Sequence, residues 1–377
     1  MWLDNKQLTQ QLLHNVKRII LSFVMAAMLM VSCQDDCWNI FGKDNSVDIV
    51  LKVTSPQMDS TRNEVSGLDS ALGAIDNFNN NEYMWEEYDL RYSLEIYEVV
   101  TSGTATTTSE QPIYKRQVIT TDDYNPNGVN FKIRVVPNRT YKFVIWADFV
   151  VESSKEDLFY NTTNLRAISR KADYVHTAME EALDAYHISL TKEIKGSVTL
   201  DAKLTRPMAK LRVVAIDHSE ISSYSTPSKV DIKFDTEKNP VYRVFNAVSN
   251  SISDNCTAHE YNLTVNPAPY KAYTGSTEEG ETISGFVLFS DYIFAERAIN
   301  EGEKNEQPVS FSMDVYDQDN KPIRSIDFDT QIPISRNYLT TIIGNCLTQK
   351  ENIIVKINDT LLNHENTLVE QDDYIVK

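Results

Sequence analysis

Residues Val129–Val135 read VNFKIRV, in which every second residue is apolar and the residues between them are polar or charged. Because successive side chains of a β-strand point to opposite faces, this alternation places one face on a core and the other in water. Every second residue is also apolar in the segments 90–96, 198–204, 230–234, 311–315 and 353–357. Antiparallel sheets show such alternation, whereas buried parallel strands read as continuous apolar runs. The sequence therefore predicts an all-β fold of antiparallel sheets.

Turn-forming residues separate these segments. Asn125-Pro126-Asn127-Gly128 precedes one predicted strand, and the segment 317–322, DQDNKP, separates two and predicts a hairpin. Short strands at regular spacing favour β-sandwiches. The chain has 377 residues, and domains typically contain about 100–200 residues, so we expect two sandwich domains.

One segment in the N-terminal half has a different period. Asp173–Tyr186 carries apolar residues at helical spacing and predicts one short helix. The charged stretch Lys192–Gly196 follows it, and we place the domain boundary there. The predicted organisation is a signal peptide over residues 1–32, an N-terminal sandwich over 33–194 and a C-terminal sandwich over 195–377.

Composition restricts the classes of partner. Asp and Glu total 54 against 36 Lys and Arg, for a formal charge of −18. Nucleic-acid phosphates require a cationic face, so this balance argues against a nucleic-acid partner. Four cysteines are too few for a disulfide-dense scaffold. Cys256 and Cys346 either form a disulfide or remain as buried thiols.

The N-terminus has the features of a secretory signal. Lys17 and Arg18 precede Ile19–Val31, which contains 13 residues without a charge. A membrane-spanning helix needs about 20 predominantly apolar residues, whereas 13 suits the apolar region of a signal peptide. Ser32 and Cys33 follow, and the segment resembles the lipobox of bacterial lipoproteins, in which the cysteine thiol accepts a diacylglycerol. The alternative is a plain secretory signal that is cleaved nearby.

The residues after the cysteine are acidic. Gln34, Asp35 and Asp36 resemble the surface-export signal of lipoproteins in Bacteroidota-type bacteria. With a lipid on Cys33, this resemblance implies a surface-exposed protein that is anchored in the cell outer membrane. The alternative is an ordinary solvated acidic start.

Motifs for catalysis and for metal or phosphate binding are missing from the sequence. It contains no G-x-S-x-G, H-E-x-x-H, Walker or G-x-G-x-x-G motif. Asp217-His218-Ser219 contains the residue types of a catalytic triad, but adjacent side chains of one strand point to opposite faces. Asp317–Asp319 lacks the glycine and distal glutamate of an EF-hand, so a solvated turn is the better interpretation than a calcium site. We expect no catalytic residues, no metal, no cofactor and no enzymatic activity.

Four segments together resemble the fimbrillin-like lipoproteins of Bacteroidota-type bacteria, whose better-known members build type V pili. They are Arg139–Asp148 (RTYKFVIWAD), Leu204–Val213 (LTRPMAKLRV), Ile334–Thr348 (ISRNYLTTIIGNCLT) and the lipobox. The resemblance implies two tandem transthyretin-like β-sandwiches. It also implies a structural subunit of a surface fimbria, with other pilin subunits or further copies of itself as partners, that serves cell adhesion.

The resemblance further implies assembly by strand exchange. A protease cuts the lipidated precursor after a basic residue that follows the first strand, and a strand of a neighbouring subunit fills the groove that the first strand leaves. In this sequence Arg62 is the candidate cleavage point, and the tail Leu368–Val376 is the candidate donor. The removable strand is Val47–Val53, with four side chains facing inward: Val47, Ile49, Leu51 and Val53. In the donor, Leu368, Tyr374 and Val376 share a face, but Glu370 and Asp372 interrupt it.

Two polar segments, Met58–Glu82 and Asn358–Lys377, have no obvious place in a core. They contain three copies of a motif that resembles the O-glycosylation sequon of these bacteria. The candidate acceptors are Ser60, Ser70 and Thr360.

Two other functions are compatible with the same sequence. One is a monomeric surface lipoprotein that keeps its first strand and binds a partner or a glycan. The other is an anchor or accessory subunit that stays lipidated. Cleavage of the chain after Val53 distinguishes the fimbrial subunit from both.

Overall fold

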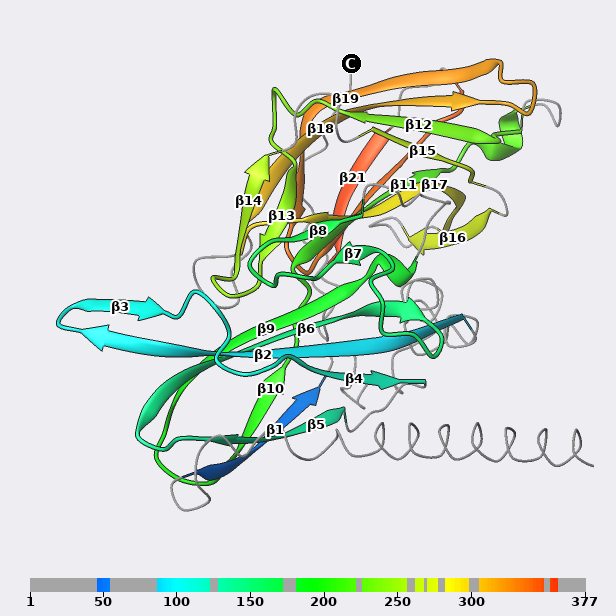
Figure 1. The fold of residues 1–377 in the computed structure, drawn as a ribbon. Coiled ribbons are helices and arrows are strands. Elements are labelled where there is room, and N and C mark those ends of the chain that lie inside the picture. The colour runs from blue at the N-terminus through cyan, green and yellow to red at the C-terminus, as the bar shows by residue number, and fades with distance from the viewer. Residues whose placement is uncertain are drawn as a thin grey trace, which may run out of the picture.

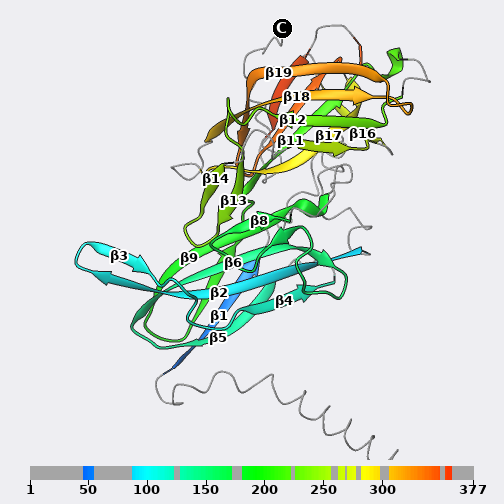
Figure 2. The same ribbon diagram turned by 45° about the horizontal axis from the view of Figure 1, so that its top comes forward.

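The computed structural model describes residues 46–54, 87–122, 128–171, 181–221, 226–255, 262–267, 270–276, 282–297, 305–348 and 353–358. These residues fold mainly into β-strands that form four sheets and pack as two sandwiches, each with its own buried core (Figures 1 and 2). The predicted all-β fold with two tandem sandwiches is confirmed. No helix within the described ranges is long and apolar enough to cross a membrane.

The first sandwich consists of a three-stranded and a five-stranded sheet. The order of the smaller sheet is β10 (Val198–Lys203), β1 (Val47–Thr54) and β5 (Val129–Val135). The order of the larger sheet is β3 (Ala105–Thr108), β2 (Tyr88–Ser102), β6 (Arg139–Val151) and β9 (Ala185–Ile194), with β4 (Gln117–Thr121) also paired to β2.

The second sandwich consists of a nine-stranded and a four-stranded sheet. The order of the larger sheet is β21 (Ile353–Asn358), β20 (Leu339–Gly344), β11 (Met208–Ala215), β17 (Thr282–Phe294), β13 (Tyr242–Asn246), β8 (Ile168–Arg170) and β7 (Tyr160–Asn161), with β14 (Ser251–Asn255) on β13 and β16 (Lys271–Ser276) on β17. The order of the smaller sheet is β15 (Asn262–Val265), β12 (Lys229–Phe234), β18 (Glu306–Tyr316) and β19 (Pro322–Ser335).

Most strand pairs are antiparallel, as predicted, but β1 pairs with β10 and β11 pairs with β20 in parallel. The hairpin predicted at residues 317–322 joins β18 to β19. A 3₁₀ turn, η5 (His218–Glu220), follows β11.

The domain boundary predicted after residue 194 requires correction. The first three residues of the charged stretch Lys192–Gly196 are the end of β9, and the rest belongs to the short connection to β10. Strand β10 returns to the first sandwich, where Leu200 and Ala202 are part of its core. The change from one core to the other occurs between Met208 and Ala209, which belong to different hydrophobic clusters. In the opposite direction, β7 and β8 from the N-terminal half extend the large sheet of the second sandwich.

The helix predicted over Asp173–Tyr186 is also corrected in part. Its first residues lie outside the described ranges. Its described end contains a single 3₁₀ turn, η4 (Glu181–Leu183), and Ala185 already begins β9. Two of the apolar residues that suggested a helical face, Ala182 and Leu183, are buried because the 3₁₀ turn packs into the first core.

Aromatic side chains join the two sandwiches. Because side chains alternate along a strand, Phe143 and Ile145 of β6 lie on one face and Trp146 lies on the other. The Trp146 ring packs edge-on against Tyr160, with 5.4 Å between centroids, and lies 6.1 Å from the ring of Phe245 on β13. One hydrophobic cluster therefore runs from the first sandwich into the large sheet of the second.

Buried ion pairs accompany this aromatic junction. Arg206 Nε donates to both carboxylate oxygens of Asp184, at 2.9 and 2.7 Å, and Tyr186 Oη donates to Asp184 at 2.8 Å. Arg170 on β8 pairs with Asp291 on β17. Removing one partner of such a buried pair typically costs about 3–5 kcal/mol, because the other charge remains buried and unpaired.

His187 lies on β9 at the same junction and is 1% exposed. Its Nε2 donates to the carbonyl of Ala247 at 3.0 Å, and its Nδ1 faces Arg336 Nη2 at 3.5 Å. A carbonyl only accepts hydrogen bonds, so these contacts define a neutral imidazole protonated on Nε2. Burial lowers the pKa of His187 to about 3, and the positive charges of Arg336 and Arg297 act in the same direction.

We predict that His187 makes the folded state less stable in acid. An unfolded histidine binds a proton near pH 6.5, whereas folded His187 does not until about pH 3, so the free energy of unfolding falls as pH decreases between these values. Between pH 7 and pH 4, urea unfolding should show that the wild type loses up to roughly 3 kcal/mol more than His187→Gln. Parallel pH profiles for the two proteins would contradict this prediction.

Candidate functional site

The first strand, β1, occupies the centre of the three-stranded sheet and has a neighbour on each side. It pairs antiparallel with β5, from Val47 opposite Val135 to Val53 opposite Val129. It pairs parallel with β10, from Ile49 opposite Val198 to Thr54 opposite Lys203. In Figure 1 the blue arrow of β1 therefore lies between two strands that come from distant parts of the sequence.

The side chains of β1 alternate between core and solvent. Ile49, Leu51 and Val53 are at most 1% exposed, and Val47 packs against the same core while partly buried. Their inward orientation, which was predicted from the sequence, is confirmed. The intervening residues Asp48 and Lys52 are exposed. The β1 side chains thus supply one apolar edge of the first core, and the outward face is mostly polar, with the half-buried Val50 between Asp48 and Lys52.

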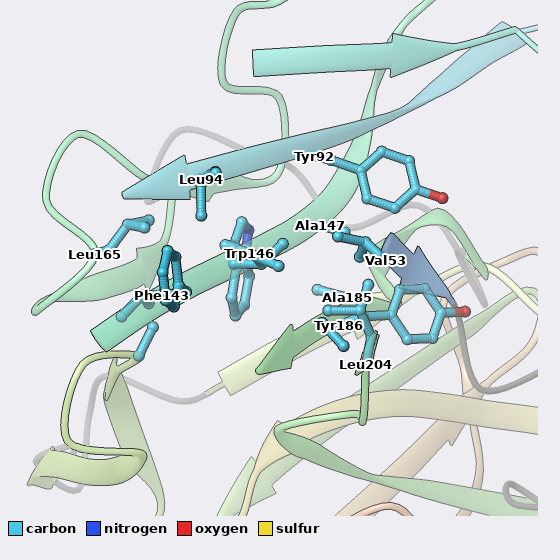
Figure 3. Close-up of a cluster of buried hydrophobic side chains, with 14 of the residues drawn as sticks. Val53, Tyr92, Leu94, Phe143, Trp146, Ala147, Leu165, Ala185, Tyr186 and Leu204 are labelled. Atoms are coloured by element: carbon cyan, nitrogen blue, oxygen red, sulfur yellow. The ribbon is translucent and has the colours of Figure 1, made fainter. Parts of the chain in front are cut away.

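The inner end of β1 reaches the centre of the first sandwich. Figure 3 shows Val53 among Ala147, Ala185 and Tyr186, residues of the five-stranded sheet. All four residues are fully buried. Full burial of a Val, Leu or Ile side chain stabilises a fold by about 1.5–3 kcal/mol, so the inward residues of β1 contribute substantially to the first sandwich.

Main-chain contacts hold both ends of β1. The N–H of Asp48 donates to Ser197 Oγ at 3.1 Å, and the carbonyl of Thr54 accepts from the N–H of Leu204 at 2.8 Å. If β1 left this position, the facing edges of β5 and β10 would expose unpaired N–H and C=O groups beside an open apolar groove. Such edges recruit another extended chain, because main-chain pairing is independent of side-chain identity.

The other residues singled out in the sequence lie outside the described ranges. These are the lipidation and export residues Cys33, Gln34, Asp35 and Asp36, the cleavage residue Arg62, the donor residues Leu368, Tyr374 and Val376, and the glycosylation candidates Ser60, Ser70 and Thr360. Their roles stay predictions.

Asp217, the acidic member of the triad-like tripeptide, has a structural role. It is 1% exposed, and its carboxylate accepts the main-chain N–H groups of Leu347 at 3.0 Å and Thr348 at 2.7 Å. The carboxylate thereby fixes the loop that follows β20 against the end of β11. The neighbouring His218 packs on Phe286, with 4.1 Å between ring centroids.

Asp317 organises the turn between β18 and β19. Its Oδ1 accepts the N–H groups of Asp319 at 2.9 Å and Lys321 at 2.8 Å. Its carboxylate therefore satisfies the turn backbone, in agreement with the solvated-turn interpretation. Within the described ranges, no group of three or more His, Cys, Asp or Glu side chains is arranged to hold a metal ion.

Cys346 is a free thiol and is fully buried, and its Sγ faces the carbonyl of Val214 at 3.7 Å. Burial raises the pKa of this thiol. A buried thiol with a raised pKa is unreactive, because the thiolate is the reactive form. Cys256 lies outside the described residues.

A model of a family of unknown function, DUF6562, matches residues 42–373. The chain belongs to this family. The DUF6562 match begins before β1 and ends beyond β21, so both sandwiches lie inside it. No curated protein matches the sequence.

Solved structures from Bacteroidales are similar to this DUF6562 chain over most of their length. A candidate adhesin from Bacteroides thetaiotaomicron has 11% identity and a TM-score of 0.41, over 84% of this chain and 96% of that one. A fimbrial assembly protein from Parabacteroides distasonis has 9% identity and a TM-score of 0.31, over 83% and 94%. The fimbrial anchor protein Mfa2 from Porphyromonas gingivalis has 11% identity and a TM-score of 0.32, over 82% and 96%.

Sequence reasoning missed that β1 is paired on both sides. The alternation in 198–204 identified β10 as a strand, but the charged stretch before it suggested that it opened the second domain. Strands β1 and β10 are far apart in the sequence, and no local pattern shows that two distant strands pair. Their apolar faces match, but this match does not by itself identify them as partners.

We predict that the inward residues of β1 are essential for stability and that the outward ones are not. Leu51→Ala should lower the free energy of unfolding by about 2–5 kcal/mol, because it leaves a cavity at a fully buried position. Val50→Ala, on the outward face of the same strand, should cost about 1 kcal/mol or less. Urea unfolding measures both, and equal losses would contradict the assigned orientation.

Proposed function

We propose that this protein is a structural subunit of a surface fimbria that serves cell adhesion. In this proposal a protease releases β1 from the chain, and a strand of a neighbouring subunit takes its place. The partner is another pilin subunit or a further copy of this chain. The proposed role is structural and not enzymatic.

The observation that carries the proposal is the placement of β1. It is the first strand, it is paired on both sides, and it completes the first core with alternating aliphatic side chains. A removable strand needs this arrangement, because its departure opens a groove that a second strand can fill with the same backbone and side-chain contacts. A strand at a sheet edge would leave only a new edge behind.

The cleavage point follows from the sequence after β1. Arg62 lies eight residues beyond Thr54, in the stretch between β1 and β2. A cut there would separate β1 covalently from the rest of the sandwich without touching a residue of either sheet. The released β1 would then be held by main-chain hydrogen bonds, by its inward side chains and by the exposed ion pair of Asp48 with Arg134.

The donor strand has two candidates. The tail Leu368–Val376 would place Glu370 and Asp372 on the same face as its apolar residues, and burying those carboxylates is costly. Ile353–Asn358, the β21 strand, reads IIVKIN and matches IVLKVT of Ile49–Thr54 at every apolar position and at the lysine. It also stands at the end of its sheet, so its release breaks one ladder and not two. We favour β21 as the donor.

The same proposal includes a lipid anchor. A diacylglycerol on Cys33 would attach the precursor to the outer membrane, and Gln34–Asp36 would direct it to the cell surface. A single acyl chain gives marginal membrane binding, whereas two or more give stable anchoring. Cleavage at Arg62 would separate the body from this anchor.

The mature N-terminus tests the processing step. Mass spectrometry of protein from the native cell surface should find a start at Asn63, because cleavage after Arg62 removes the anchor and β1 together. Another start between residues 54 and 90 would support the same function with a different cleavage point. A start at acylated Cys33 would overturn strand removal and favour the anchor subunit or the monomeric surface lipoprotein.

Peptide uptake tests the donor. The chain can be cut with a site-specific protease after its recognition sequence is placed at Arg62, and labelled peptides can then compete for the groove. We expect a peptide of residues 353–358 to exchange in, and its Val355→Lys variant, which places a charge on the inward face, to be excluded. Uptake of a 368–376 peptide instead would make the tail the donor. Failure of every peptide, including residues 47–54, would contradict strand exchange.

A further inference from the structure

Gly128 lies directly before β5 and touches the main chain of β1. A Cβ atom on Gly128 would stand 1.8 Å from the carbonyl oxygen of Val53, 2.8 Å from its carbonyl carbon and 3.2 Å from the Cα of Thr54. Cβ atoms essentially never approach other heavy atoms closer than 3.0 Å. The atoms in conflict belong to a backbone and not to a flexible side chain, so only a shift of β1 or β5 would make room.

The opposite side of β1 prevents such a shift. The carbonyl of Thr54 accepts the N–H of Leu204 at 2.8 Å, and the side chains of Val53 and Leu204 are both fully buried. The main chain at Val53–Thr54 is therefore held between Gly128 and Leu204. Moving away from Gly128 would require β1 to push into the Leu204 side of the groove.

We propose that Gly128 is a positioning residue for the strand that lies between β5 and β10. Its lack of a side chain leaves room for the main chain of that strand and fixes where the strand ends. The inference rests on the proposed function where the occupant is a strand from another subunit. The side chain at the position of Thr54 is free to vary, but the extended main chain must pass Gly128 to reach the N–H of Leu204. The expected partner is thus an extended peptide with aliphatic residues at the positions of Ile49, Leu51 and Val53 and at least one further residue.

The chain contains a matched control for this glycine. Gly103, in the turn between β2 and β3, has φ +62°, and Gly128 has φ +66°. Both positions strain an L-residue to a similar extent, because positive φ disfavours a Cβ. At Gly103, however, a Cβ would meet no atom within 4 Å. Any difference between the two alanine variants therefore reports the contact with β1.

The first experiment uses the intact chain. Urea unfolding of Gly128→Ala and Gly103→Ala separates the contact from the backbone strain, whatever the fate of β1 in the cell. We expect Gly128→Ala to unfold at clearly lower urea than Gly103→Ala, or to fail to fold while Gly103→Ala folds. Equal midpoints for the two variants would overturn the proposed contact role of Gly128.

The second experiment tests whether Gly128 sets the end of the strand. Labelled peptides of residues 47–54 and 47–52 compete for the groove of the chain cut at Arg62. In the wild type the longer peptide should bind at least about thirtyfold more tightly, because it adds the hydrogen bond to Leu204 and a buried valine. In Gly128→Ala that advantage should disappear, while the shorter peptide binds both proteins within about twofold.

The outcomes separate the two proposals. Equal weakening of both peptides by Gly128→Ala would reduce Gly128 to a residue of general stability and overturn its role at the strand end. If Gly128→Ala does not fold, equal affinity of the two peptides for the wild type would overturn that role. If the cut chain takes up no peptide at all, strand exchange fails, and the urea comparison still decides whether Gly128 positions β1.

Discussion

The first sandwich depends on the two ladders that β1 forms with β5 and β10. These two strands do not pair with each other, so without β1 the three-stranded sheet has no continuity. The three partners begin at residues 47, 129 and 198, and their pairing closes long loops before it gains any contact. The sandwich is therefore complete only when the chain through β10 is present. Its first strand thus has the least local pairing in the sandwich, and Ile49, Leu51 and Val53 on its inward face are buried.

The second sandwich is coupled to the first through a shared interior. The chain passes from one core to the other between Met208 and Ala209, within a single strand. Trp146 and Phe245 bring rings from both sandwiches together, and Arg206 with Asp184 fills the same junction with satisfied charges. Close-packed interiors transmit strain, so a substitution that changes side-chain volume in the first core also alters the packing at the junction.

Local patterns in the sequence identified strands but not their partners. Alternation located β5, β12 and β18 because one face of each is more buried than the other. It also located β2, although the intervening polar residues Arg91, Ser93 and Glu95 of that strand are buried as well. The partner of β10 depends on which apolar faces meet in the folded chain. The charged stretch 192–195 predicted a linker between domains, but it lies at the end of β9 and in the connection that follows it. Only the described end of the segment Asp173–Tyr186, from Glu181 onward, differs from the predicted helix, because a turn followed by a strand can also bury residues at helical spacing. For the candidate site, the alternation of apolar residues identified the inward side chains of β1. The pairing of β1 with β10 and its contact with Gly128 depend on the folded chain and have no local sequence signal.

The two-sided pairing of β1 also has a mechanical consequence. A pull along the axis of a strand with a neighbour on each side loads the hydrogen bonds of both ladders together, in shear. A strand peeled from an edge instead breaks its bonds one after another. Forced separation is governed by the rate of crossing the unfolding barrier and not by equilibrium stability. A strand held between β5 and β10 would therefore resist a pulling force far better than its equilibrium affinity suggests.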